Sequence, residues 1–195
     1  MNVELIHYTP LRICSHAIRQ CWDSHALSDS DADTIGERDK LLIERVGNKD
    51  KHGSVLEFLT YTFEIQDIST SCLLELTRHR HASYAVRSSR YTLKKSKLAY
   101  QKSRSKLVNG LIWATLACIK ILIHFKISND DLKLALPQAY CYSLDMQINA
   151  RSLQNLLSLR TARGAHFHIQ ELARALYDKI PDDHKYIFVN NVNNK

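Results

Sequence analysis

One stretch near the middle of the chain carries the strongest signal, a run of planar cations and hydroxyls that reads Arg78-His79-Arg80-His81-Ala82-Ser83-Tyr84-Ala85-Val86-Arg87-Ser88-Ser89-Arg90-Tyr91. It lies in a window without acidic residues. Between Glu75 and Asp130 there is no carboxylate, but twelve Lys and Arg residues, whereas the rest of the chain sums to about −5. The formal net charge of +7 is therefore concentrated in this window.

Such a density of guanidinium groups indicates an anion-binding site. Like charges repel, and arginine does not lose its proton to relieve the repulsion. Phosphate is the expected partner, because its oxygens accept two parallel N–H bonds from one guanidinium, and these bonds are about twice as strong as neutral ones. Composition alone allows a second interpretation, a solvated basic face.

The spacing around the motif favours the anion site. A helix is predicted from Ser69 through Arg80, with Ser69 as its N-cap. Glu75, Arg78 and His79 then lie at i, i+3 and i+4 and share one face near the helix C-terminus. The carboxylate can hold the neighbouring guanidinium in one rotamer.

The residues after the predicted helix are expected to form a loop. It contains Ser83, Ser88, Ser89 and Arg90. Hydroxyls and free backbone N–H groups in such a turn can bind an anion as a nest does.

Here the sequence resembles the flavin-dependent thymidylate synthases, in particular the short Helicobacter and Campylobacter type. The family signature is Arg-His-Arg, seven residues, then Ser, and this chain has Arg78-His79-Arg80 and Ser88. Further ordered matches are His7-Tyr8-Thr9-Pro10, His52-x-Ser54-x-x-Glu57, Leu136-Pro137 and the segment from Asn149 to Arg160. Together they cover most of the chain.

The resemblance implies the reaction and its cofactors. Members methylate dUMP to dTMP, with a methylene group from methylenetetrahydrofolate and a hydride from FADH2, which NADPH regenerates. The cofactors carry the difficult chemistry, while the protein supplies binding, orientation and charge. The implied fold is α+β, a mainly helical protomer around a small sheet, assembled as a homotetramer.

The resemblance also assigns roles to residues. Arg160 matches the arginine that hydrogen-bonds the uracil and helps to ionise its N3, and we take it as the catalytic residue. The expected flavin contacts are Ser54, Glu57, Arg78, His79, Arg80, Asn149, Arg151 and Asn155. The expected dUMP contacts are Glu75, Arg78, Ser88, Ser89, Arg90, Lys133 and Arg160. His52 is expected near the flavin ring and folate.

The segment from Asn149 to Arg160 has the periodicity of a helix with a buried apolar stripe. Arg151 and Asn155 are four residues apart and share a second face. Arg160, nine residues after Arg151, points about 180° away from it at about 100° per residue. Opposed polar faces on one helix favour sites shared between subunits, and a solvated amphipathic helix is the alternative.

The remaining predictions concern the whole chain. With 195 residues and 45% apolar composition, we expect one domain spanning 1–195. Strands are predicted at 3–8, 58–65 and 140–148. Helices are predicted from Pro10, with Thr9 as N-cap, at 35–46 and 107–125, and twice near the end.

Localisation and partners follow from the same evidence. The N-terminus shows no signal peptide. The uncharged stretch 107–119 is too short to span a bilayer, so no membrane association is expected. Five unpaired cysteines, expected to be buried, indicate a reducing cytoplasm. The pairs His79-x-His81 and His166-x-His168 lack further ligands at metal-site spacing, so no metal is expected.

Two departures from the family pattern keep alternatives open. Between Arg90 and the long helix the chain lacks roughly twenty residues and carries the basic segment 94–106 instead, and Phe58 stands where most members have His. The chain is therefore either an active synthase or a degenerate member that binds flavin or nucleotide without turnover. A nucleic-acid-binding module is the third alternative, which few interleaved aromatics support, so we expect no nucleic-acid partner.

Overall fold

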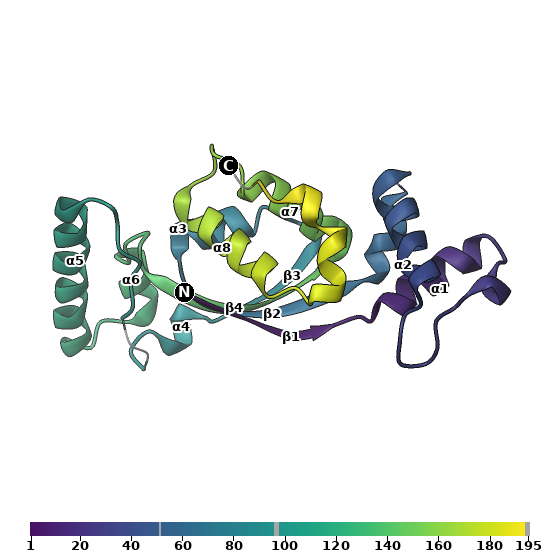
Figure 1. The fold of residues 1–195 in the computed structure, drawn as a ribbon. Coiled ribbons are helices and arrows are strands. Elements are labelled where there is room, and N and C mark those ends of the chain that lie inside the picture. Colours follow the sequence, from purple (N-terminus) through teal and green to yellow (C-terminus); the bar gives the residue numbers. More distant parts are fainter. Residues whose placement is uncertain (51, 96–97, 194–195) are drawn as a thin grey trace. The chain divides into compact units, whose positions relative to one another are not determined.

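The computed structural model describes residues 1–50, 52–95 and 98–193 (Figure 1). Contacts divide the chain into two compact units. The first unit comprises Met1–Asn2, Ile65–Arg78 and Tyr84–Asp145, and the second comprises Val3–Glu64, His79–Ser83 and Met146–Lys195. Within the predicted basic segment, Ser96 and Lys97 lie outside the described residues.

A four-stranded sheet with the order β1-β2-β4-β3 runs through the fold. Its strands are β1 (Asn2–Tyr8), β2 (Thr60–Ser69), β3 (Ala82–Val86) and β4 (Cys141–Asn149). In β2, the side chains of Tyr61, Phe63 and Ile65 are fully buried while their neighbours in the strand are more exposed, as expected for alternation across a sheet. The α+β class is confirmed, and the ends of the three predicted strands are correct within four residues.

The second unit holds most of the helices. They are α1 (Leu11–Cys21), α2 (Glu37–Ile43), α7 (Ala150–Arg160) and α8 (Phe167–Asp178), with a π-helical segment Glu44–Lys49 after α2 and 3-10 segments η1 (His25–Leu27), η3 (Gly53–Phe58), η4 (Asp182–Ile187) and η5 (Val189–Asn191). α1 packs against α2 and η3, and α7 packs against α8 and η3. Segment η3 is therefore fixed between α1 and α7.

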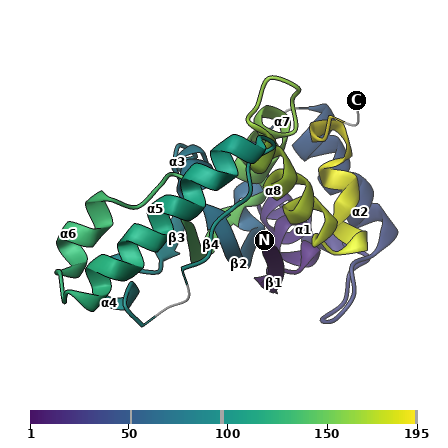
Figure 2. The same ribbon diagram turned by 90° about the vertical axis from the view of Figure 1, so that its left-hand side faces the viewer.

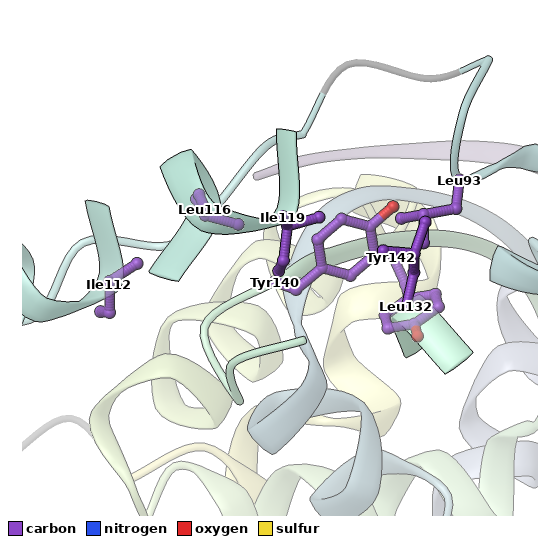
Figure 3. Packing of buried hydrophobic residues seen from close by; sticks show 7 residues of the cluster. All are labelled: Leu93, Ile112, Leu116, Ile119, Leu132, Tyr140 and Tyr142. Atoms are coloured by element: carbon purple, nitrogen blue, oxygen red, sulfur yellow. The ribbon is translucent and has the colours of Figure 1, made fainter. Parts of the chain in front are cut away.

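The first unit contains α3 (Thr70–Leu76), α4 (Ser89–Thr92), α5 (Lys106–His124) and α6 (Asn129–Leu134). α5 lies beside α6, and α6 packs against α4 (Figure 2). Their shared core consists of Leu93, Ile112, Leu116, Ile119, Leu132, Tyr140 and Tyr142 (Figure 3). The tyrosine rings meet edge to face with centroids 5.2 Å apart, a favourable aromatic geometry.

The predicted helix from Ser69 through Arg80 is wrong at its C-terminal end. Ser69 is the N-cap, and its hydroxyl accepts a hydrogen bond from the Cys72 N–H at 3.2 Å. The helix, however, ends at Leu76, and the Thr77 hydroxyl donates to the Leu73 carbonyl at 3.0 Å. The chain must become extended again to pair as β3, so the motif arginines lie in the connection between helix and strand.

The predicted loop after the motif is also wrong in part. Ser83 lies in β3, Ser88 is the N-cap of α4, and Ser89 and Arg90 form its first turn. Apolar and polar side chains do not alternate regularly in β3, so the sequence pattern did not indicate a strand there. Pairing with β4 determines this segment.

The predicted N-cap of the first helix is wrong. Pro10 is the N-cap of α1, whereas the Thr9 hydroxyl lies 2.8 Å from the Thr60 hydroxyl and accepts from the Thr60 N–H at 3.2 Å. Thr9 therefore ties the chain to β2 instead of capping a helix.

The helix predicted at 107–125 is confirmed within one residue at each end, but the prediction that it is too short to span a bilayer counted only its uncharged run. α5 has 19 residues, and it is the one helix in the described part of the chain that is long and apolar enough, by length and composition, to cross a membrane. Only 17% of its most apolar window is buried. The uncharged run 107–119 underestimates the apolar length, because the helix continues past Lys120 through three more aliphatic residues.

Candidate functional site

Helix α7 is the scaffold of the site in the second unit. Ala150, Leu153, Leu156 and Leu157 are completely buried and fix its orientation. Asn149 is the N-cap, and its side-chain oxygen accepts from the Ser152 N–H at 2.9 Å. The predicted start and end of this helix are confirmed, so the polar residues between them have defined directions.

Arg151 forms an ion pair that joins α7 to η3. Its Nη1 lies 2.7 Å from the Glu57 Oε1, although both side chains are about half exposed. A Cβ at Gly53 would lie only 3.3 Å from the Arg151 Nε, so glycine permits the guanidinium to pass close to the backbone. Two predicted flavin contacts from distant parts of the sequence, Glu57 and Arg151, are therefore brought together.

Arg160 meets the motif histidine at the other end of α7. Its Nε donates to the His79 Nε2 at 3.0 Å, across 81 residues of sequence. His79 is buried with 8% exposure, and as an acceptor its Nε2 carries no proton in this arrangement. The predicted uracil-binding arginine and the predicted flavin triplet thus share one hydrogen bond.

A polar pocket of about 370 Å³ lies beside these residues. It is lined by Glu57, Thr60, Arg80, His81, Ala82, Ser83, Gln147, Ile148 and Asn149. Arg80 supplies a cation for a diphosphate, and the amides and hydroxyls supply donors and acceptors for a heterocycle. The pocket chemistry fits a flavin nucleotide, and three of its lining residues, Glu57, Arg80 and Asn149, were predicted as flavin contacts.

The first unit holds the other predicted nucleotide residues. Glu75 Oε1 and Arg78 Nη1 lie 3.6 Å apart as an i, i+3 pair, although Arg78 follows the end of the helix. Arg90 contacts Asp130 of α6 at 3.1 Å, and its carbonyl accepts from Asn129 at 2.7 Å. α4 and α6 are thus held together.

The phosphate-loop residues differ in exposure. Ser88 and Arg90 are exposed, while Ser89 is buried with its hydroxyl 3.4 Å from the Tyr142 hydroxyl, which donates to it. Ser89 therefore serves the packing of α4, with its hydroxyl bonded to Tyr142 and its carbonyl accepting from the Leu93 N–H. Lys133 is exposed on α6.

His52, Ser54 and Asn155 are also exposed. His52 is the N-cap of η3 and Ser54 lies inside that segment, so both stand near the Glu57 and Arg151 pair in sequence and fold. Exposure leaves all three accessible to a ligand.

Several relevant residues were missed from the sequence. The Arg87 side chain donates from Nη2 to the Cys141 carbonyl at 3.0 Å, and its backbone N–H donates to the Ser143 carbonyl at 2.9 Å. Arg87 therefore holds the end of β3 against β4. Gln147, from β4, lines the pocket. Alternation in β4 was the one signal that could have marked Gln147 as facing away from the core.

Two of the buried cysteines, Cys14 and Cys141, are not activated as nucleophiles. Burial raises the pKa of the Cys14 thiol to about 12 and that of Cys141 to about 11. The expectation that all five cysteines are buried is wrong, because Cys21 and Cys118 are exposed. In residues 1–50, 52–95 and 98–193, no three His, Cys, Asp or Glu side chains are grouped to hold a metal ion.

Comparisons with known proteins agree with this geometry. The profile of the family Thy1, described as thymidylate synthase complementing protein, matches residues 4–183. The flavin-dependent thymidylate synthase of Wolinella succinogenes is 44% identical over 202 aligned positions, covering 96% of this chain and 97% of the relative. The Helicobacter pylori protein of that name is 43% identical, with the same coverage of both chains.

A solved structure is similar over nearly the same length of chain. Thymidylate synthase X from Helicobacter pylori, with FAD and dUMP, superposes with a TM-score of 0.91 and 41% identity over 98% of this chain and 99% of that chain. The profile match, the two relatives and the superposed structure agree over almost the whole sequence. The chain belongs to the flavin-dependent thymidylate synthase family.

Proposed function

We propose that this chain is an active flavin-dependent thymidylate synthase that binds FAD and converts dUMP to dTMP. The carbon comes from methylenetetrahydrofolate, and NADPH reduces the flavin. The observation that carries this proposal is the hydrogen bond between Arg160 and His79, because it joins the proposed uracil site to the proposed flavin site. The solved Helicobacter pylori relative binds both FAD and dUMP.

The residues have distinct roles in this proposal. Arg160 presents a permanent cation to the uracil, which favours loss of the N3 proton and makes the ring more nucleophilic. Arg78, with Ser88 and Arg90, supplies charge and donors for the nucleotide phosphate. FAD, when bound, supplies the hydride.

Residues of α7 and of the pocket would bind FAD. Arg80 and Asn149 line the pocket, and the ion pair with Glu57 keeps Arg151 in one rotamer at its edge. Such preorganisation reduces the entropy lost when a ligand binds.

We further propose that the enzyme is a cytoplasmic homotetramer with sites shared between subunits. The opposed directions of Arg151 and Arg160 on α7 support shared sites. The five cysteines lack the paired spacing of a disulfide framework, which supports a reducing compartment.

A degenerate relative without turnover is the second candidate. The alignment with the Wolinella protein spans 202 positions but only 96% of these 195 residues, so about fifteen aligned positions have no counterpart in this chain. Phe58 is 56% exposed at the end of η3, next to Glu57. A shortened substrate region and an exposed aromatic in place of histidine could each lower turnover.

The visible absorbance spectrum of the protein with FAD, recorded before and after dUMP, tests the proposal. We expect a bound-flavin spectrum that shifts with dUMP, followed by dTMP formation when methylenetetrahydrofolate and NADPH are added. Either a shift without dTMP or an absence of flavin binding would count against an active synthase and support the degenerate candidate. For the degenerate candidate, Phe58→His should then restore product formation.

A further inference from the structure

Arg160 lies in the last turn of α7, the part of a helix that is least secured by the helix itself. The last four carbonyl groups of an α-helix have no partner within the helix, so its end frays unless other groups bind them. Helix α7 ends at Arg160, and its C-cap is Thr161. The direction in which the Arg160 side chain leaves the helix therefore depends on what holds this end.

The C-terminal segment, residues 189–193, is bonded to this end of α7. The Asn193 side chain donates from Nδ2 to the Ser158 carbonyl at 3.1 Å, and its backbone N–H donates to the Thr161 hydroxyl at 2.9 Å. The Asn191 side chain donates from Nδ2 to the Ser158 hydroxyl at 3.0 Å. The segment thus binds both the last turn of the helix and its C-cap.

Thr161 connects these bonds to the helix. It is 1% exposed, its hydroxyl donates to the Leu157 carbonyl at 2.7 Å, and its N–H donates to the same carbonyl at 3.0 Å. The hydroxyl oxygen also accepts from the Asn193 N–H and, at 3.2 Å, from the Asn193 Nδ2. Because one buried hydroxyl donates to the helix and accepts from the segment, the two form a single hydrogen-bonded unit.

The side chain of Arg160 is restrained at its other end as well. Its Nε donates to the His79 Nε2 at 3.0 Å. A guanidinium group is planar, so a bond at Nε fixes the plane of the whole group. The segment secures the backbone from which the side chain starts, and His79 secures the group in which it ends.

The family profile matches residues 4–183, so the C-terminal segment lies outside the part of the chain that the profile describes. We propose that this segment is a positioning element for Arg160, which fixes the last turn of α7 so that the guanidinium meets the uracil of dUMP. A side chain already held in place loses less freedom when it binds a ligand. In this role Asn191 and Asn193 act through Arg160. The inference rests on the proposed function and adds a structural element to it.

Two substitutions at Thr161 test the proposal. Thr161→Val keeps the shape of the side chain but removes the hydroxyl that joins the helix to the segment. It should weaken dUMP binding on the order of tenfold and lower the rate of dTMP formation by a similar factor. Thr161→Ser keeps the hydroxyl and should behave as the wild type does. FAD affinity, measured by absorbance, should be the same in both, since the pocket residues are unchanged.

Gln154→Ala is the matched control. Gln154 also lies on α7, and its Nε2 donates to the Ile187 carbonyl and to the Asn48 Oδ1, both at 2.8 Å. The variant therefore removes two bonds of the same helix, but more than one turn before Arg160. We expect it to lose thermal stability as Thr161→Val does and to keep its dUMP affinity. Equal loss of dUMP affinity in the control, or normal dUMP binding and turnover in Thr161→Val, would overturn the proposal.

A double-mutant cycle separates positioning from general support of the fold. Asn193 is exposed, so Asn193→Ala should fold even if Thr161→Val does not, and it should weaken dUMP binding several-fold. In an Arg160→Ala background the same change should add nothing, because the group through which it acts is gone. A further loss of equal size would show that the segment does not act through Arg160, and the proposal would be wrong.

Binding of dUMP also separates this inference from the proposed activity. Calorimetry measures it without turnover. If the wild type binds dUMP but forms no dTMP, the proposed activity fails while the cycle still tests the C-terminal segment. A wild type that neither binds dUMP nor forms dTMP would overturn both.

Discussion

Helices α7 and α5 are alike on the face that packs in the core and differ in polarity on the other faces. Each buries an apolar stripe in its own unit. The other faces of α7 carry polar groups with partners in the chain, such as Arg151 with Glu57 and Arg160 with His79. The other face of α5 is apolar and exposed. The polar groups Arg151 and Arg160 of α7 bond to their own chain, whereas the other face of α5 is apolar and left exposed.

The largest expected effect is on stability, which the buried stripe of α7 should support far more than the exposed apolar face of α5 does. Leu156→Ala in α7 should lower the free energy of unfolding by about 2–5 kcal/mol, because it opens a cavity in a completely buried site. Leu111→Ala in α5 should change it by less than about 0.5 kcal/mol when measured on dissociated protein. Urea unfolding at low protein concentration measures both. Similar losses would mean that the α5 face is already packed within the chain.

The second prediction concerns the catalytic end of α7. Arg160→Ala should lower the rate of dTMP formation by about a hundredfold or more, because it removes the cation that favours ionised uracil. FAD should still bind, since the pocket residues are unchanged. Stopped assays and flavin titration check the two outcomes. Normal turnover in this variant would show that Arg160 has another role.

The third prediction separates capping from binding at the other end of α7. Asn149→Ala should cost about 1 kcal/mol of stability through loss of the N-cap. It should also weaken FAD binding. Asn149→Asp keeps the capping oxygen but loses the amide donors, so it should retain the stability and still bind FAD less well. If Asn149→Asp bound FAD normally, the amide would have no part in the flavin site.

The smallest effect is a shift of stability with pH. His184 is buried, with its Nδ1 2.7 Å from the Tyr61 hydroxyl, and burial lowers its pKa despite the nearby Asp183. The unfolded chain therefore binds a proton at a higher pH than the folded chain does, so stability is full above about pH 6.5 and declines as the pH falls below it.

Thermal unfolding between pH 8 and 5.5 measures this decline. His184→Gln should be less stable at pH 8 but should lose less on acidification than the wild type does. Parallel pH curves for the two proteins would assign the decline to other groups.

The parts of the fold that the sequence predicted are those with local signals. The apolar stripe of α7, the bounds of that helix and the N-cap Ser69 follow from spacing and residue type within a few positions. The end of α3 and the strand β3 could not be predicted, because pairing with β4 overrides the helical pattern of the motif. The buried pair of Arg19 and Asp39 was also missed, because the two residues meet only when α1 packs against α2.

That pair shows how burial changes an ordinary surface residue. Asp39 is completely buried, and its carboxylate accepts from Arg19, Ser28 and Ser30. Burial by itself raises the pKa of Asp39, but the hydrogen bonds from Ser30, Ser28 and Arg19 outweigh it and hold the pKa below its usual value. Its partners lie 9 to 20 residues away, Arg19 in α1 and the two serines in the connection before α2.

The sequence by itself determined the family, the basic window, the α+β class and the helix that carries Arg151, Asn155 and Arg160. These depend on residue type and short spacing, which the chain displays before it folds. Only the tertiary structure decided that Arg160 meets His79, that Arg151 meets Glu57, and that one face of α5 is left exposed. Those facts depend on which distant segments are brought together, and burial of the apolar stripes, not local propensity, selects that arrangement.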